Sequence, residues 1–254
     1  MKIADKVVVI TGAAGGIGLA LARRCRAEGA RGLVLADLHR EPLEKAAVEV
    51  GGVAVTCDVA REDDVKALIA QAERQFGTID IFFSNAGIYR PGGEESPDGD
   101  WTLNWNIHVM AHVYASRQLM PRMAAQKSGY FVITSSAAGL LTHVVSATYA
   151  TTKHAAVAFA EYLSITYGTQ GVRVSVLCPQ AVRTAMTENL TQTTSKVDGM
   201  LEPEDLADCV VETMDAERFL ILPHPTVLEY LRRKTSDYDR WLGGMRRLKE
   251  RSLS

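Results

Sequence analysis

The chain has little cysteine, little net charge and no long hydrophobic run, and each shortage argues against a class of protein. Four cysteines occur in 254 residues, at Cys25, Cys57, Cys178 and Cys209, scattered through apparent helices and strands. Such isolated positions predict buried thiols in a reducing cytosol rather than a disulfide framework or a cysteine metal site.

The charge balance and the N-terminal sequence also favour a cytosolic protein. A formal net charge of −2 favours neither nucleic acid nor a membrane surface as a partner. No stretch is apolar for long enough to span a bilayer. The first residues, Met-Lys-Ile-Ala-Asp-Lys, lead straight into a β-branched run without the apolar core of a signal peptide. We therefore expect a cytoplasmic protein that acts on a small molecule.

Strand and helix patterns alternate along the chain, and its length suits one α/β domain. Strands are predicted at 6–11, 33–37, 53–57, 80–83, 129–135, 172–178 and 218–222. Helices are predicted at 16–29, 41–50, 62–76, 101–126, 149–169 and 204–216. This order predicts a doubly wound parallel sheet, the Rossmann fold, covered by helices on both faces. Ligands of such sheets bind at the carboxyl ends of the strands.

The segment 223–254 lies beyond the predicted domain, 1–222, and is basic and amphipathic. Its apolar residues, Tyr230, Leu231, Trp241 and Leu242, favour a helical extension that docks on the domain or on a partner subunit. A binding site for an anionic partner is the alternative.

Tyr149 and Lys153 stand at i and i+4, so a helix that opens at Tyr149 places a phenol beside an ammonium. A cation ~5 Å away, at an effective dielectric of ~20, favours the phenolate by about 3 kcal/mol, or roughly 2 pK units. The phenol then becomes a general acid or base near neutral pH. The alternative interpretation is a core tyrosine and a surface lysine at a common helical spacing.

A glycine-rich turn follows the first strand. The run Val7-Val8-Val9-Ile10 leads into Thr11-Gly-Ala-Ala-Gly-Gly-Ile-Gly18, and an apolar helical pattern comes next. Glycines let the backbone approach a pyrophosphate, and the helix N-terminus supplies N–H groups and a positive dipole end. This arrangement predicts a dinucleotide site.

Taken together, these stretches resemble the short-chain dehydrogenase/reductase family. The family's Thr-Gly-x-x-x-Gly-x-Gly pattern matches Thr11 to Gly18, and its Asn-Ala-Gly motif matches Asn85 to Gly87. Its Pro-Gly-x-Val-x-Thr motif matches Pro179 to Thr184, with Gln180 in place of the usual glycine. The resemblance runs from about Lys6 to about Leu222.

The resemblance implies roles for individual residues. Ser136, Tyr149 and Lys153 match the catalytic residues. Cofactor contacts are implied for Thr11, Gly12, Gly15, Gly16, Ile17, Gly18, Asp37, Leu38, Asp58, Val59, Asn85, Ala86, Gly87, Tyr149, Lys153, Pro179, Val182 and Thr184. Within this set Asp58 would hold the adenine amine and Thr184 the nicotinamide carboxamide. The family's substrate lid corresponds to about 185–203.

The fourth catalytic residue of the family is an asparagine that supports a water molecule on the lysine. Its usual distances from Trp101 and from Pro121 both lead to His108 in this chain. We expect His108 to support the water relay, since an imidazole can donate to or accept from water. A shifted helix, with Asn106 in that role, is the alternative. His108 and His112 lack a third ligand, so no metal is expected.

Asp37 ends the second predicted strand and predicts a preference for NAD(H) over NADP(H). A carboxylate there accepts hydrogen bonds from both adenosine ribose hydroxyls and repels the 2′-phosphate of NADP. Each charge pair at ~4 Å costs about 4 kcal/mol at an effective dielectric of ~20. The following Leu38 supplies no compensating cation. The alternative is a solvated residue at the end of a strand.

We expect the substrate pocket to be mainly apolar, lined by Ala137, Leu140, Leu141, Thr142, His143, Val144, Tyr89, Gln180 and Met186. Its candidate carboxylate-binding cations are Arg90 and Arg183, and both are equally consistent with a solvated position. This pocket predicts hydride transfer between NAD(H) and a hydrophobic ketone or secondary alcohol, with Tyr149 as acid or base. The alternative function is a catalytically weak NAD-binding protein that acts through its basic tail.

A homo-oligomer, a tetramer or a dimer, is expected as well. The helices at 101–126 and 149–169 carry apolar residues beyond what one sheet face covers, at Val113, Tyr114, Ala156 and Phe159. The family pairs these helices across a two-fold axis.

Overall fold

A seven-stranded parallel sheet with the order β3-β2-β1-β4-β5-β6-β7 forms the centre of the protein. The computed structural model describes residues 1–188 and 198–253. The strands are β1 (Val7–Thr11), β2 (Gly32–Asp37), β3 (Val53–Thr56), β4 (Ile81–Ser84), β5 (Gly129–Thr134), β6 (Val172–Leu177) and β7 (Leu220–Ile221). The direction of winding reverses between β1 and β4, and a crevice forms at such a reversal. The predicted fold class is confirmed.

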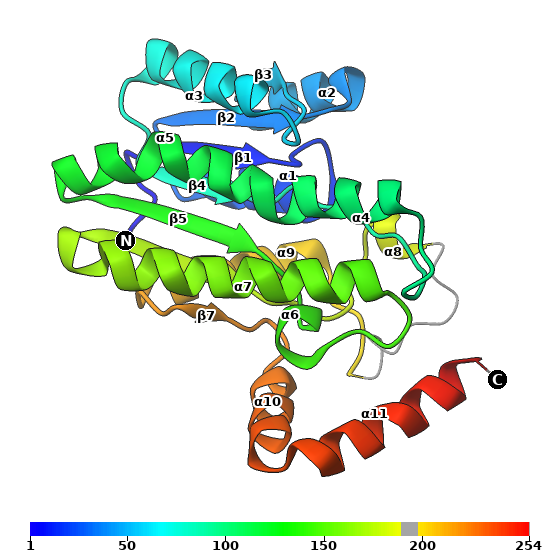
Figure 1. The fold of residues 1–254 in the computed structure, drawn as a ribbon. Helices are drawn as coiled ribbons and strands as arrows, with labels where there is room; N and C mark the ends of the chain where they lie inside the picture. Colours follow the sequence, from blue (N-terminus) through cyan, green and yellow to red (C-terminus); the bar gives the residue numbers. More distant parts are fainter. Residues whose placement is uncertain (189–197, 254) are drawn as a thin grey trace.

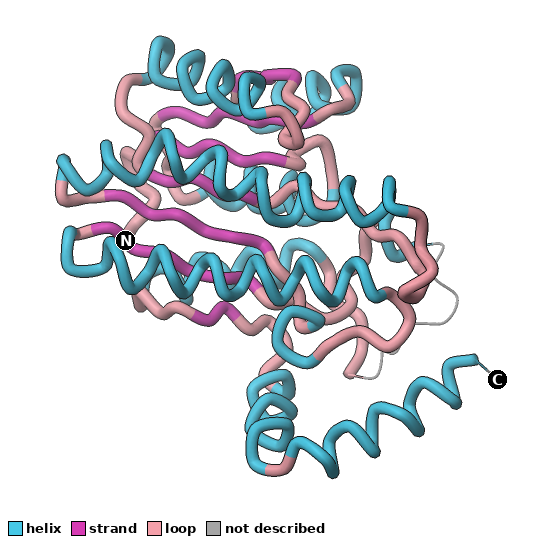
Figure 2. The backbone as a smooth tube through the Cα atoms, viewed as in Figure 1, coloured by secondary structure: helices cyan, strands magenta, loops and turns pink. Residues whose placement is uncertain are grey.

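Helices cover both faces of this sheet (Figures 1 and 2). Buried residues of α3 (Glu62–Phe76), α5 (Ala111–Gln126) and α7 (Ala147–Tyr167) pack on one face. Those of α1 (Gly16–Ala27), α2 (Arg40–Val50) and α9 (Pro203–Asp215) pack on the other. All five residues of β1 are buried, because a central parallel strand has helices above and below it.

Two of the predicted helices differ in detail from the observed ones. The helix predicted at 101–126 begins earlier, as α4 (Asp98–Trp105), and continues through a π-helical turn, Asn106–Met110, into α5. The helix expected to open at Tyr149 begins at Ala147, because Ser146 caps it by accepting a hydrogen bond from the Tyr149 N–H at 3.2 Å. Tyr149 therefore lies in the first turn of α7.

The C-terminal extension consists of α10 (Thr226–Ser236) and α11 (Tyr238–Leu253). The buried Lys234 of α10 donates a hydrogen bond of 2.7 Å to the carbonyl of Leu140, in the short helix α6 (Ala138–Leu141). Asp198 accepts hydrogen bonds from Thr226 at 2.9 Å and from Tyr230 at 3.0 Å. In contrast to α10, α11 projects along the edge of the molecule on which α6 and α8 (Ala185–Glu188) lie (Figure 1).

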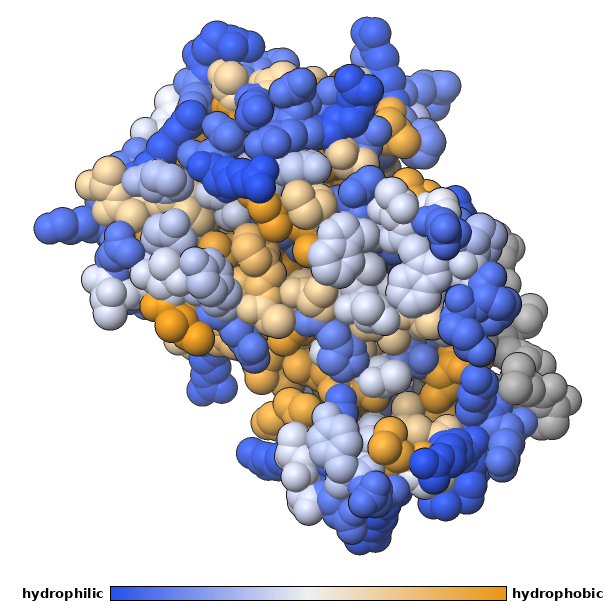
Figure 3. All heavy atoms as spheres, viewed as in Figure 1, coloured by the Kyte–Doolittle hydropathy of each residue, from blue (hydrophilic) through white to orange (hydrophobic). Residues whose placement is uncertain are grey.

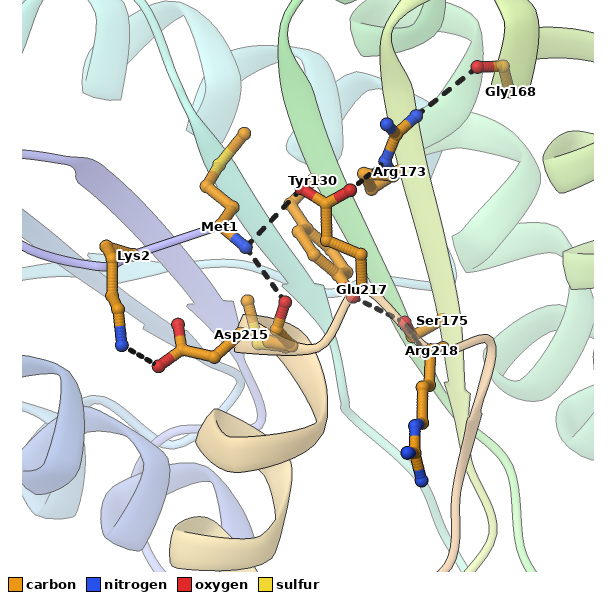
Figure 4. Close-up of polar contacts among 10 residues, drawn as sticks. Met1, Lys2, Tyr130, Gly168, Arg173, Ser175, Asp215, Glu217 and Arg218 are labelled. Atoms are coloured by element: carbon orange, nitrogen blue, oxygen red, sulfur yellow. Dashed lines mark hydrogen bonds and ion pairs between the residues drawn. The ribbon is translucent and has the colours of Figure 1, made fainter.

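Polar contacts connect the first residue of the chain to the turn that leads from α9 into β7 (Figure 4). The amino group of Met1 lies 3.7 Å from the Glu217 carboxylate, which also accepts a hydrogen bond of 2.6 Å from Arg173 of β6. Beside them, the hydroxyl groups of Tyr130 and Ser175 lie 2.7 Å apart and link β5 to β6. This network holds the short edge strand β7 in register, far from the carboxyl ends of the strands.

Apolar side chains are visible along the band where α5 and α7 run (Figure 3). Tyr162 and Ile165 of α7 are 61% and 81% exposed. Ala156, which we expected at a subunit contact, is instead buried in the core of the chain itself. Tyr114 and Phe159 also pack partly against that core. The homo-oligomer stays a prediction, and Tyr162 and Ile165 are the residues of α7 best placed for a contact.

The turn between β1 and α1 depends on close backbone contacts. Gly12 has a φ of +68°, a left-handed conformation that favours glycine. A Cβ atom on Gly18 would overlap the carbonyl oxygen of Gly12, so the first turn of α1 packs directly on the strand end. In contrast, Gly15 has an extended backbone and no atom within 4 Å of an added Cβ.

We expect Gly18→Ala to destabilise the fold and Gly15→Ala to leave its stability near that of the wild type. The clash at Gly18 is with backbone, which cannot rotate away, and such overpacking costs about 1–3 kcal/mol. At roughly 2–4 °C per kcal/mol for a domain of this size, thermal unfolding measures the difference. Equal melting temperatures for the two variants would contradict the close packing described for Gly18.

Candidate functional site

A cavity of about 920 Å³ crosses the carboxyl ends of the strands and contains most of the predicted site residues. Predicted residues on its wall are Gly12, Gly15, Gly16, Ile17, Gly18, Asp37, Leu38, Asp58, Val59, Tyr89, Asn85, Ala86, Gly87, Ser136, Ala137, Leu141, Thr142, His143, Tyr149, Lys153, Pro179, Gln180, Val182, Thr184 and Met186. Four predicted residues, Thr11, His108, Leu140 and Val144, are not on the wall. Thr11, His108 and Leu140 are buried behind the surface, and Val144 is half-buried beside it.

Asn85 connects the ends of three neighbouring strands. Its amide nitrogen donates to the Thr11 carbonyl at 3.0 Å, and its amide oxygen accepts from the Thr134 hydroxyl at 3.0 Å. Its backbone N–H donates to the Thr11 hydroxyl at 2.9 Å. Thr11 therefore has a structural role: its carbonyl and hydroxyl groups hold Asn85 in place beneath the surface of the cavity.

Asp37 lies at the end of β2, on the cavity wall beside the glycine turn. One carboxylate oxygen accepts from the Ala14 N–H at 3.1 Å, and the other accepts from the His39 N–H at 3.1 Å. These bonds orient the carboxylate and leave lone pairs on both oxygens. Leu38 beside it is 58% exposed and carries no charge.

Ser136, Tyr149 and Lys153 meet at the inner end of the cavity. Ser136 Oγ accepts from the Ala138 N–H at 3.1 Å and donates to the Pro179 carbonyl at 3.3 Å. Lys153 is 3% exposed, and its Nζ donates to the Thr134 carbonyl at 3.0 Å. The same Nζ lies 5.5 Å from the centre of the Tyr149 ring. A phenol, a hydroxyl and an ammonium therefore face one space.

The pKa values differ from our expectation that Lys153 brings the Tyr149 phenol toward neutrality. In the protein alone, burial raises the pKa of Tyr149 to about 12, and the hydrogen bond with Ser136 opposes this rise only in part. Burial also lowers the pKa of Lys153 to about 8. Removal of both groups from water penalises their charged forms, and this burial is the largest cause of both shifts.

His108 lies beside Lys153, in the π-helical turn. The Ile88 N–H donates to its Nε2 at 3.1 Å, so its Nδ1 carries the proton and pairs with Thr152 Oγ1 at 2.9 Å. A Cβ atom added to Gly87 would lie 3.6 Å from His108 Nε2 and 3.7 Å from Lys153 Nζ. Both ring nitrogens are therefore engaged, and neither remains for the water that we expected the imidazole to hold.

The protonation state of His108 is set by its surroundings. Burial, and then the charge of the neighbouring Lys153, hold the pKa of His108 well below its ordinary value. The imidazole therefore stays neutral through the physiological range. Asn106, the alternative to His108, is half-buried in the same π-helical turn and is not on the cavity wall.

Aromatic rings enclose Tyr149 on the substrate side. The ring centres of Tyr89 and His143 lie 5.4 and 5.9 Å from that of Tyr149, and both rings meet it edge to face. Burial lowers the pKa of His143, which keeps this imidazole neutral. The space in front of the phenol is thus uncharged and largely apolar.

The C-terminal extension supplies a wall that our sequence analysis missed. Tyr230 and Arg233 of α10 line the cavity, as do Trp241, Gly244, Met245, Leu248 and Arg251 of α11. We had noted the amphipathic pattern of this segment and interpreted it only as a docking surface. Arg90 and Arg183, the candidate cations for which a solvated position was the alternative, are not on the wall and lie near Asp100 and Glu202 respectively.

Of the lid predicted at 185–203, residues 189–197 lie outside the described residues, and Ala185–Glu188 form the short helix α8. Within the part of the chain that the structure describes, no cluster of three or more His, Cys, Asp or Glu could hold a metal ion. Among these same residues, no helix combines the length and the apolar character needed to cross a membrane.

Comparisons with known proteins agree with this geometry. The model of the short chain dehydrogenase family matches residues 6–195. The 1-deoxy-11-beta-hydroxypentalenate dehydrogenase of Streptomyces exfoliatus is 34% identical over 247 residues, which cover 93% of this chain and 90% of that protein.

Solved structures are similar over nearly the whole chain. A short chain dehydrogenase/reductase from Burkholderia phymatum in complex with NAD has a TM-score of 0.84 and 30% identity, with 94% of this chain and 96% of that chain covered. L-Sorbose reductase from Gluconobacter frateurii, complexed with NADPH and L-sorbose, has a TM-score of 0.77 and 27% identity, with 87% and 95% covered. On its motifs, its sheet and these relatives, the chain belongs to the short-chain dehydrogenase/reductase family and is one of its oxidoreductases.

Proposed function

We propose that this oxidoreductase transfers hydride between NAD(H) and a hydrophobic secondary alcohol or ketone, with Tyr149 as the general acid or base. The observation that carries the proposal is the convergence of Tyr149, Ser136 and Lys153 at the inner end of an apolar cavity. Two hydroxyl groups there can hold a carbonyl oxygen, and a buried cation stabilises negative charge on it.

The residues present fit a nicotinamide dinucleotide. Gly12, Gly16 and Gly18 let the turn pack closely on its neighbours at the N-terminus of α1, and Gly15, where an added Cβ meets no atom within 4 Å, leaves open space for a pyrophosphate. Asp37 would hold the adenosine ribose, and Asp58 and Thr184 would lie along the adenine and nicotinamide ends. When bound, the cofactor supplies or accepts the hydride.

The protein's own residues handle the proton and the orientation of the substrate. Ser136 Oγ and the Tyr149 hydroxyl would both bind the substrate oxygen, and Tyr149 gives up its proton as a ketone is reduced or accepts one as an alcohol is oxidised. Because burial holds the pKa of Tyr149 at about 12, a phenolate needs a nearby positive charge to become accessible. Lys153, held by Thr134, already lies beside the ring at that pKa, so a phenolate at neutral pH requires positive charge in addition to Lys153.

The similarity to relatives supports an alcohol substrate. It does not decide between NAD(H) and NADP(H), so the cofactor preference is argued from Asp37. One relative is named for a dehydrogenase reaction on a hydroxypentalenate, and one similar structure contains NAD while another contains NADPH. An NAD preference therefore rests on this chain's own carboxylate at the end of β2. A catalytically weak NAD-binding protein that acts through its tail is less well supported, since the tail lines the cavity.

Tyr149→Phe should remove most turnover, by about 100-fold or more, and leave NAD(H) binding nearly unchanged. Only the transferable proton is lost, and general acid–base catalysis contributes roughly 10²–10⁴-fold. Steady-state kinetics at the nicotinamide absorbance and titration of cofactor fluorescence measure the two effects. Tyr162→Phe, on an exposed face of the same helix, is the matched control. Near-normal turnover in Tyr149→Phe would refute the mechanism.

The double variant Asp37→Ser, Leu38→Arg should reverse the cofactor preference from NAD(H) to NADP(H). The change removes a carboxylate that repels the 2′-phosphate and adds a cation that attracts it. The dissociation constants of both cofactors, measured for the wild type, Leu38→Arg and the double variant, separate the two contributions. The proposal would be wrong if the wild type bound NADP(H) more tightly.

His108→Ala should lower turnover about 10-fold with a smaller effect on NAD(H) binding, because it removes two buried hydrogen bonds that position Ile88 and Thr152. His108→Asn, which places the family residue there, should retain more activity than His108→Ala. Since His108 stays neutral, pH–rate profiles between about pH 5.5 and 8 should have the same shape in the wild type and His108→Asn. A titration near pH 6.5 that only the wild type shows would restore the water-relay role.

A further inference from the structure

The C-terminal extension provides one wall of the cavity. Trp241, Met245 and Leu248 occur at i, i+4 and i+7, so they share one face of α11, and all three line the cavity. Hydrophobic side chains are visible in the hollow between the body of the domain and this extension (Figure 3). The wall faces the same space into which Tyr149 opens.

The position of this wall is held by polar contacts with the domain. Lys234 bonds to α6, which begins two residues after Ser136, and Asp198 bonds to Thr226 and Tyr230. Asp198 also accepts a hydrogen bond of 2.9 Å from Gln180, the residue that replaces the family's glycine after β6. The extension is thus connected on two sides to segments that form the inner cavity.

Charge is unevenly distributed along the cavity. The carboxylates on its described wall, Asp37 and Asp58, both lie at the end next to the glycine turn and β3. The charged side chains that the extension adds are two guanidinium groups, Arg233 and Arg251. Between these ends lie Lys153 and the uncharged rings that surround Tyr149.

Taking the proposed function as its basis, we propose that the substrate carries a carboxylate at the end remote from the reacting carbon, bound by Arg233 and Arg251, with an apolar body between. The apolar body would contact Tyr89 and His143 on one side and Trp241, Met245 and Leu248 on the other. A guanidinium binds a carboxylate in preference to a neutral ester, because its N–H groups match the carboxylate geometry and charge.

Both arginines are exposed and have contacts within their own helices, Arg251 through a hydrogen bond of 3.3 Å from its Nε to the Arg247 carbonyl. Arg233 forms an ion pair with Glu229 one turn away, and its guanidinium lies 5.8 Å from the ring centre of Tyr230. Arg251 lies near the end of α11, ten residues after Trp241, on the same helix face as the apolar wall. An anionic group would therefore enter last and remain near solvent, where its desolvation cost is low.

The test uses three probes that differ only at the remote end. They are a cyclohexanone that carries a para-carboxyphenyl group opposite the ketone, the methyl ester of this acid, and the phenylcyclohexanone without a carboxyl group. For each, kcat/KM for NADH-dependent reduction is measured with the full-length wild type, Arg233→Gln, Arg251→Gln and the double variant. Arg232→Gln and Arg246→Gln are the matched controls, since both residues are exposed on the same helices and off the cavity wall.

We expect the wild type to prefer the acid over the ester by about 10-fold or more, since a guanidinium forms stronger hydrogen bonds with a charged carboxylate than with a neutral ester. The double variant should lose this preference, and both controls should keep it. Trp241→Ala should raise KM for all three probes, because it shortens the apolar wall that they share. Equal use of acid and ester by the wild type, or a preference that the double variant retains, would overturn the inference.

A second measurement separates this inference from the proposed function. Calorimetric titration of the NADH-bound protein with the acid and with the ester reports on the anion site without turnover. If no probe is reduced but the acid binds and the double variant weakens it about 10-fold, the proposed reaction fails and the anion site stands. If the neutral ketone is reduced while acid and ester bind equally, the anion site fails and the proposed reaction stands.

Discussion

The burial of the Lys153 ammonium at the ends of the central strands is the constraint on which the site depends. A buried cation needs a partner, and Lys153 finds one in the carbonyl of Thr134, the last residue of β5. The Thr134 hydroxyl in turn bonds to Asn85, which bonds to Thr11 at the end of β1. The polar groups that hold the catalytic residues are therefore continuous with the sheet, so the site is as rigid as the strands beneath it.

The same burial sets the electrostatics of the site. It raises the pKa of Tyr149 to about 12 and lowers that of Lys153 to about 8, so the protein by itself keeps the phenol protonated. His108, whose two ring nitrogens are both bonded, adds no charge. The acid–base chemistry that we propose thus depends on positive charge brought close to Tyr149, and the surrounding neutral rings leave that charge unscreened.

The C-terminal extension completes the cavity on the side away from the glycine turn. Its helices α10 and α11 line that side with an apolar helix face and two guanidinium groups. The contacts of Lys234 and Asp198 connect this outer wall to the segments after β5 and β6. Because the wall is built from residues far along the chain, it can vary without disturbing the glycine turn or the Ser136, Tyr149 and Lys153 arrangement.

The sequence by itself determined the sheet, the glycine turn and most of the cavity wall, since these depend on local patterns. Buried β-branched runs predict parallel strands, and parallel strands bring Asp37, Asn85 and Ser136 to one edge. Only the tertiary structure decided three matters. The hydrogen bonds of His108 to Ile88 and Thr152, made from the π-helical turn, gave it a positioning role. Burial raised the pKa of Tyr149 although Lys153 lies beside it. Packing placed Arg233 and Arg251 on the cavity wall and left Arg90 and Arg183 off it. Each of these depends on contacts between residues distant in the chain, which helical and strand periodicity do not encode.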